Sequence, residues 1–174
     1  NSVFFKRIGS GAHATVYKFK IDKKLVLNTK ILYPGEYVLK LLIAEYLYWK
    51  PNEIDYLNLL SKYGLIPKIF IIGKNYFIGK YIDGYTLAEI KYMLADHEIE
   101  KDEYLKIEDS VDEIISIWAK LNFSHKDLHD ENILVSKDFN HIYLIDPNPY
   151  NRQKGYNEHI FRQRSDNKNR PSSF

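Results

Sequence analysis

Cysteine is absent from the chain, which excludes disulfide bonds, thiol nucleophiles and cysteine-ligated zinc. Long apolar runs are absent too. The clearest ones, Leu39–Ala44 and Ile69–Ile72, are far shorter than the roughly 20 residues that a membrane-spanning helix needs. Charge of one sign is not in excess either, since 25 Lys and Arg oppose 23 Asp and Glu. A net charge of +2 does not predict nucleic-acid binding.

Apolar side chains are plentiful enough for a core, because they make up 45% of the 174 residues. This length suits one domain or two small lobes. Residues 1–83 are expected to form a sheet of about five strands with one inserted helix, Pro51–Tyr63. The second half has helical periodicity at Leu87–Asp96 and Ile107–Asn122. The expected strands are Val3–Ile8, Thr15–Ile21, Tyr37–Leu42, Lys68–Ile72, Tyr76–Ile82, Asn132–Ser136 and His141–Ile145, with Leu25–Leu32 ambiguous. The pattern therefore predicts an α+β protein.

The strongest chemical signal is the sequence S-H-K-D-L-H-D-E-N-I-L. It contains H-x-D-x4-N at His125, Asp127 and Asn132, and a short hairpin follows that ends at Asp146. Carboxamide and carboxylate oxygens suit Mg²⁺, which shares its other positions with water and phosphate. Asp127 is placed to orient or deprotonate a hydroxyl. The alternative is a polar loop whose side chains satisfy one another, since such a spacing recurs by chance in roughly one chain of this length in fifty.

A glycine cluster, Gly9-Ser10-Gly11, lies between two predicted strands. Glycines at such a place let backbone amides approach a phosphate closely. The alternative, which the cluster by itself favours, is an ordinary turn.

A lysine, Lys40, lies inside an apolar strand and therefore needs a partner or a function. Glu53 on the following helix is placed to be that partner. The alternative is a lysine whose ammonium reaches solvent from an edge strand, and Lys30 competes for the functional role.

The order of these signals resembles the protein-kinase-like superfamily over nearly the whole chain. The resemblance implies a minimal two-lobed fold, with an N-lobe at 1–79, a hinge at 80–85 and a truncated, mainly helical C-lobe at 86–174. In this resemblance the nucleotide is held by Gly9, Ser10, Gly11, Ala12, Val16, Lys40, Glu53, Lys80, Tyr81 and Ile82. Among them, Lys40 holds the α- and β-phosphates, Glu53 positions Lys40, and Lys80–Ile82 form the adenine hinge. Asp127 is the implied catalytic base, and Asn132 and Asp146 are the implied magnesium ligands.

The chain departs from the usual protein-kinase pattern at several positions, and these departures indicate which class of kinase it resembles. Asp146-Pro147-Asn148 replaces D-F-G, and His129 stands where serine/threonine kinases usually carry lysine. H-x-D-L-H is commoner in small-molecule kinases. Gly79 falls near the gatekeeper position, which would leave the back of the adenine pocket open. Only 28 residues follow Asp146, too few for the late helices that usually bind peptides.

The truncation makes the chain resemble compact bacterial type III effector kinases of the HopBF type. That family phosphorylates the host ninety-kilodalton heat-shock chaperone. The resemblance implies a monomeric, ATP- and Mg²⁺-dependent serine/threonine kinase, a virulence protein secreted into the host cytoplasm. Two alternatives remain open: a small-molecule kinase of the aminoglycoside, choline or lipopolysaccharide-sugar type, and a catalytically silent pseudokinase binding module. The basic tail at 150–174 is either a docking segment for an acidic partner or anionic lipid, or a solvated end.

Overall fold

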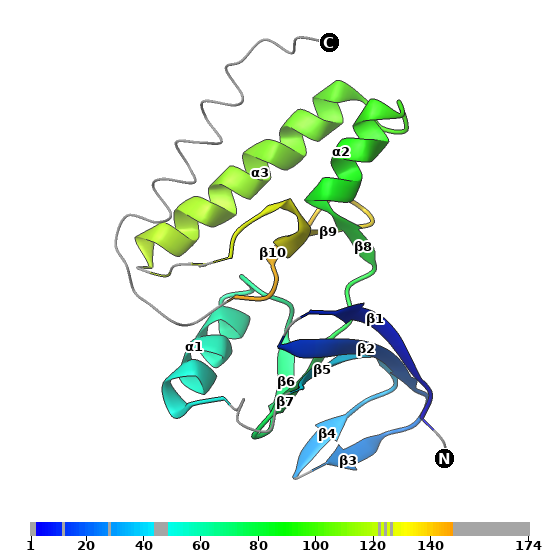
Figure 1. The fold of residues 1–174 in the computed structure, drawn as a ribbon, viewed down its shortest axis with the longest axis vertical. Coiled ribbons are helices and arrows are strands. Elements are labelled where there is room, and N and C mark those ends of the chain that lie inside the picture. The colour runs from blue at the N-terminus through cyan, green and yellow to red at the C-terminus, as the bar shows by residue number, and fades with distance from the viewer. Residues whose placement is uncertain are drawn as a thin grey trace. The chain divides into compact units, whose positions relative to one another are not determined.

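The computed structural model describes residues 3–11, 13–27, 29–43, 49–121, 123, 125 and 127–147. The chain divides into two compact units, Asn1–Ile82 and Asp83–Phe174. The predicted hinge at 80–85 spans this division. The first unit is a sheet with one helix and the second is mainly helical with a small sheet, which confirms the α+β class and the minimal kinase-like fold (Figure 1). The basic tail lies outside the described residues.

A five-stranded antiparallel sheet in the order β1-β2-β5-β7-β6 forms the first unit. Strands β2 and β5 pair along their whole length, from Ala14 opposite Leu42 to Ile21 opposite Gly35. Helix α1 lies between β5 and β6 in the chain, as expected. The elements of this unit are β1 (Phe5–Ser10), β2 (Ala14–Ile21), β3 (Leu25–Leu27), β4 (Lys30–Leu32), β5 (Gly35–Leu42), α1 (Pro51–Lys62), β6 (Ile69–Ile72) and β7 (Tyr76–Lys80).

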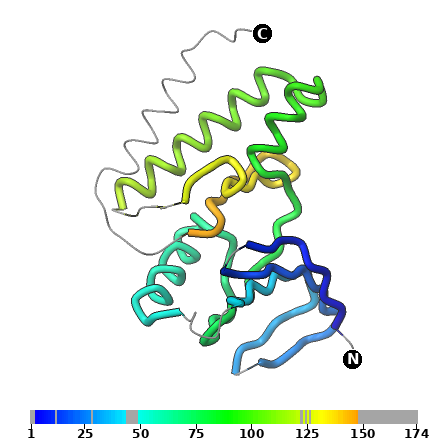
Figure 2. Tube along the Cα trace, viewed as in Figure 1, coloured from blue at the N-terminus to red at the C-terminus, as the bar shows by residue number. Residues whose placement is uncertain are grey.

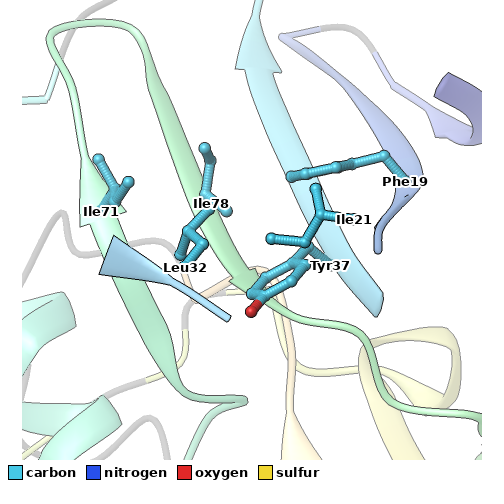
Figure 3. Packing of buried hydrophobic residues seen from close by; sticks show 6 residues of the cluster. All are labelled: Phe19, Ile21, Leu32, Tyr37, Ile71 and Ile78. Atoms are coloured by element: carbon cyan, nitrogen blue, oxygen red, sulfur yellow. The ribbon is translucent and has the colours of Figure 1, made fainter. Parts of the chain in front are cut away.

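One face of this sheet carries the core of the first unit (Figure 3). The buried side chains are Phe19, Ile21, Leu32, Tyr37, Ile71 and Ile78. The rings of Phe19 and Tyr37 stack with their centroids 5.5 Å apart. Leu32 comes from the hairpin β3–β4, and Leu25 and Leu27 of the same hairpin also pack on this cluster. The ambiguous segment Leu25–Leu32 is therefore two short strands, which turn at Thr29 with a φ of 67°.

Helix α1 begins as the sequence predicts, with Pro51 in its first turn. The carboxylate of Glu53 accepts a hydrogen bond of 2.9 Å from the backbone N–H of Lys50, which satisfies one donor at the helix start. Leu57 and Leu60 form its buried face. The predicted stop at Gly64 has a φ of 70°, a left-handed conformation that glycine adopts without strain.

The second unit packs two helices against a three-stranded antiparallel sheet in the order β10-β9-β8. Figure 2 shows the trace of β8 and β9 side by side, although their pairing partners Gly84 and Ser136 lie far apart in the chain. Helix α3 begins earlier than the predicted Ile107, because its charged first turns carry no apolar periodicity. The elements are β8 (Gly84–Thr86), α2 (Leu87–Ala95), α3 (Lys101–Lys120), the 3₁₀ turn η1 (Asp130–Asn132), β9 (Ile133–Ser136) and β10 (Ile142–Leu144). Among the described residues no helix is long and apolar enough to span a bilayer.

The turn between β9 and β10 contains a carboxyl group, that of Asp138, whose titration makes the stability of the fold depend on pH. The Ser136 hydroxyl and the backbone N–H of Asn140 donate to Asp138, and these bonds lower the pKa of its carboxyl to about 2. A carboxyl with a lowered folded pKa stabilises the fold above its unfolded pKa of about 3.9, and loses that contribution as pH falls toward 2. We expect Asp138→Asn to remove this part of the pH dependence. Thermal melting from pH 6 to 2 measures it, with Asp96→Asn, an exposed carboxylate beyond α2, as the control. Parallel melting curves for Asp138→Asn and the unaltered chain would contradict the assignment.

Candidate functional site

The sheet face opposite the core collects residues predicted to hold the nucleotide. Val16 of β2 pairs directly with Lys40 of β5, and Val38 pairs with Gly79 of β7. Val38 and Lys40 are two residues apart, so their side chains share this face. Lys40 is buried, with 8% of its surface exposed. The register thus places Val16, Lys40 and the predicted gatekeeper position on one surface of the first unit.

A buried carboxylate, Glu53, belongs to the same unit, with 2% of its surface exposed. Its Oε2 accepts from the Lys50 N–H at 2.9 Å. Its Oε1 is buried and has no hydrogen-bond partner among the described residues. Burying an unpartnered carboxylate oxygen is costly, so this atom is a ready acceptor for the pairing with Lys40 that the sequence predicts. The pairing itself stays a prediction.

The predicted phosphate loop joins β1 to β2. Gly9 pairs with Val16 and Ser10 with Thr15, and the N–H of Gly11 donates to the carbonyl of Ala14 at 2.9 Å. The Gly11 amide is therefore engaged within the turn. Ala12 lies outside the described residues.

The start of the predicted hinge is fixed by its neighbours in the first unit. The N–H of Lys80 donates to the Lys68 carbonyl at 2.8 Å, and that of Tyr81 to the Glu36 carbonyl at 3.3 Å. The Lys18 ammonium lies 3.7 Å from the centroid of the Tyr81 ring and 2.8 Å from a Glu36 carboxylate oxygen. These contacts anchor Tyr81 to β2 and β5. The N–H groups of Lys80 and Tyr81 are therefore engaged within the first unit, and the contact of this hinge with adenine stays a prediction.

A glycine is structurally favoured at position 79. A Cβ there would lie 3.2 Å from the Lys68 carbonyl oxygen and 3.5 Å from Val38 Cγ2. The first distance is tighter than most real Cβ contacts, so part of the space beside Gly79 is occupied by the backbone that leads into β6.

The histidine of H-x-D-x4-N is fully buried in the second unit. Nε2 of His125 lies 2.7 Å from the carbonyl oxygen of Ile145. A carbonyl only accepts, so Nε2 carries the hydrogen. Burial lowers the pKa of this imidazole, which favours the neutral ring. The ring packs against Trp118 of α3, with centroids 5.5 Å apart. His125 therefore links the helix α3 to the residue that precedes Asp146.

The asparagine of the motif, Asn132, forms hydrogen bonds with Asp127 and with the residue that precedes Asp146. The amide Nδ2 of Asn132 donates to the Asp127 carbonyl at 2.8 Å. The Asn132 carbonyl accepts from the N–H of Ile145 at 2.8 Å. Asp127, Asn132 and the segment leading into Asp146 are thus held by one set of hydrogen bonds. The oxygen Oδ1 of Asn132 and the carboxylate of Asp146 are the hard donors that suit Mg²⁺.

The backbone at Asp146 is strained. Its φ of 55° lies in the left-handed region, which non-glycine residues rarely adopt and which Asp and Asn tolerate best. The preceding Ile145 is hydrogen-bonded on both sides, by its N–H to Asn132 and by its carbonyl to His125. Such over-determined strain is typical of functional sites. The structure thus gives Asp146 a fixed backbone position beside the motif.

Two contacts of the motif escaped the sequence analysis. The ammonium of Lys91 on α2 pairs with the carboxylate of Asp130, 39 residues away, and so anchors η1 to α2. Nε2 of His129 lies 2.9 Å from Nδ2 of Asn132. No local signal predicts the first contact. The unusual identity of His129 was the signal for the second.

Residues 43–160 match the family model described as the RIO domain. The match covers more than half of the chain and includes Glu53, the predicted hinge, H-x-D-x4-N and Asp146. The glycine cluster and Lys40 precede it. No curated protein matches the chain.

Proposed function

Because the chain belongs to the RIO domain family of atypical, protein-kinase-like phosphotransferases, we propose that it transfers the γ-phosphoryl group of ATP to a serine or threonine hydroxyl of a protein. The observation that carries this proposal is the hydrogen bonding of Asn132, which holds Asp127 and the segment before Asp146 in one constellation. A polar loop without function has no need to bond Asn132 both to Asp127 and to Ile145, the residue before Asp146.

The residues of the second unit take distinct roles in this proposal. Asp127 orients the acceptor hydroxyl and accepts its proton. Asn132 and Asp146 would hold Mg²⁺, because a carboxamide oxygen and a carboxylate leave positions for water and phosphate oxygens. When bound, the ion neutralises charge that develops on the transferred phosphoryl group. His125 keeps Ile145, and with it the backbone of Asp146, in place.

The first unit supplies the nucleotide contacts. Lys40 neutralises the charge of the α- and β-phosphates, and Glu53 positions its ammonium. Gly9, Ser10, Gly11 and Ala12 lie along the phosphates, and Val16 covers the adenine. Phosphoryl transfer depends mainly on positioning and charge neutralisation, so each of these contacts is expected to contribute.

A small residue at the gatekeeper position predicts broad acceptance at the adenine N6 atom. We expect bulky N6-substituted ATP analogues to compete with ATP, because Gly79 has no side chain to block them. Competition against a fluorescent ATP analogue measures this, with equally bulky C8-substituted ATP as the control. Failure of the N6 series to compete would place another residue at the gatekeeper position. It would also assign Gly79 only the packing role that its contact with Lys68 indicates.

Transfer of labelled phosphate from Mg-ATP into a eukaryotic cell lysate tests the proposed function. The unaltered chain is compared with Asp146→Asn, and the ninety-kilodalton heat-shock chaperone is added purified in a parallel reaction. We expect one or a few labelled bands that disappear with the variant. The resemblance to compact effector kinases suggests a secreted protein that acts in a host cell. Labelling of the chaperone would support this proposal.

A small-molecule kinase is the second candidate, favoured by His129 in H-x-D-L-H. Phosphate transfer to aminoglycosides, choline or lipopolysaccharide sugars, with no labelled protein, would decide for it. Absence of nucleotide binding would decide for a pseudokinase binding module. The hydrogen bonds of Asn132 with Asp127 and with Ile145, the residue before Asp146, favour chemistry over that last alternative.

A further inference from the structure

The contact between His129 and Asn132 determines which atom donates the hydrogen bond and which accepts it. The same atom, Asn132 Nδ2, lies 2.8 Å from the Asp127 carbonyl oxygen and 2.9 Å from His129 Nε2. A backbone carbonyl only accepts, so this atom is the amide nitrogen and carries two hydrogens. One hydrogen points to Asp127 and the other to His129. Nε2 of His129 therefore presents its lone pair, and the ring hydrogen is on Nδ1.

The hydrogen position on His129 also determines whether His129 and Asp127 attract each other. Nε2 lies 3.8 Å from Oδ1 of Asp127, within the range of an ion pair. Nε2 carries no hydrogen, so it faces the carboxylate with a lone pair and gives no attraction there. The hydrogen-bond partner of His129 is therefore the Asn132 amide. The same Nδ2 also lies 3.5 Å from Asp127 Oδ2, which is a longer and weaker contact than the one to His129.

We propose that His129 is a positioning residue for the metal ligand Asn132, an inference that rests on the proposed function. The Asp127 carbonyl and the His129 lone pair take both amide hydrogens, so the carboxamide cannot turn over. Its Oδ1 is then the atom left to face a cation. A reversed amide would present N–H groups, which repel a cation.

The acceptor role of position 129 distinguishes histidine from lysine, the residue usual here in serine/threonine kinases. A lysine ammonium is a donor only and cannot accept from the Asn132 amide. A glutamine at position 129 retains an acceptor oxygen. The inference therefore separates substitutions by their acceptor capacity and not by their charge or size. In particular, His129→Lys, which introduces the residue usual in serine/threonine kinases, is expected to be harmful.

The test measures binding of Mg²⁺ to the complex of the full chain with a non-hydrolysable ATP analogue, by isothermal titration calorimetry. We expect His129→Ala and His129→Lys to weaken Mg²⁺ affinity about tenfold, the lower end of losses seen when a partner of a metal ligand is removed. His129→Gln should stay within about threefold of the unaltered chain. His141→Ala, which changes an exposed histidine of the same unit outside the motif, is the matched control.

A second readout separates positioning from a merely structural role. With the acceptor found in the lysate experiment, turnover by His129→Ala should fall at low Mg²⁺ and recover at high Mg²⁺, with an unchanged KM for the acceptor. Unaltered Mg²⁺ affinity in His129→Ala, or affinity in His129→Lys equal to that of the unaltered chain, would overturn the inference. If His129→Ala does not fold, the comparison of His129→Gln with His129→Lys decides. Absence of Mg²⁺-nucleotide binding by the unaltered chain would instead refute the proposed function.

Discussion

Replacing Asp146 with asparagine is expected to lower phosphoryl transfer at least about 100-fold, which corresponds to about 2.7 kcal/mol of transition-state stabilisation. The substitution removes the negative charge that would hold the cation. It keeps the side-chain shape, and asparagine tolerates the left-handed backbone at this position, where φ is 55°. Turnover is measured with the acceptor from the lysate experiment, and thermal melting reports the fold.

Alanine at the same position makes the comparison sharper. Asp146→Ala should lose a similar amount of activity and also about 1 kcal/mol of stability, because alanine in the left-handed region is strained. Glu131→Gln, an exposed carboxylate of the same loop, is the control and should retain near-normal turnover. Near-normal turnover by folded Asp146→Asn would remove Asp146 from the metal site.

The largest expected effect on stability is at Gly84. A Cβ there would lie 2.1 Å from the carbonyl oxygen of Val135 and 3.0 Å from the Cα of Ser136. Both neighbours are backbone atoms of β9, which cannot move away without breaking its pairing with β8. We expect Gly84→Ala to cost about 3 kcal/mol of unfolding free energy, the upper end for overpacking.

Urea unfolding measures this loss. Gly11→Ala is the matched control, since a Cβ at Gly11 has no neighbour within 4 Å. Its free energy of unfolding should lie within about 0.5 kcal/mol of that of the unaltered chain. If Gly84→Ala is as stable as Gly11→Ala, the backbone of β9 must lie farther from position 84 than the structure indicates.

Elements with clear periodicity were predicted well from the sequence. The alternation in β2 and the apolar run in β5 predict these strands within a few residues, and the proline and glycine around α1 do the same for the helix. Strand β8 was missed because Gly84–Thr86 is three residues long and pairs with a strand far along the chain. The hairpin β3–β4 was ambiguous because the polar residues Asn28-Thr29-Lys30 interrupt the apolar pattern of Leu25–Leu32.

In the candidate site, too, local sequence predicted some features and missed those that depend on long-range contacts. H-x-D-x4-N and the burial of Lys40 follow from local sequence, and the structure places Asp127 and Asn132 in direct contact. The double hydrogen bonding of Ile145 depends on residues that only the tertiary fold brings together. The capping role of Glu53 was also missed, because Lys50 is not one of the residues that usually begin a helix. Local patterns thus identified the reacting groups, and long-range contacts determine their orientation.

The hydrogen bond between Glu53 and the Lys50 N–H has a consequence for regulation. One carboxylate both closes the start of α1 and carries the charge predicted to face Lys40. Lys50 and Glu53 both stand at the start of α1, so rotating or sliding the whole helix would keep this hydrogen bond and change only the surroundings of the carboxylate. Moving Glu53 within its own turn would instead leave the Lys50 N–H without its acceptor. Displacement of α1 as a rigid element is therefore the movement that would separate Glu53 from Lys40 without unwinding the helix.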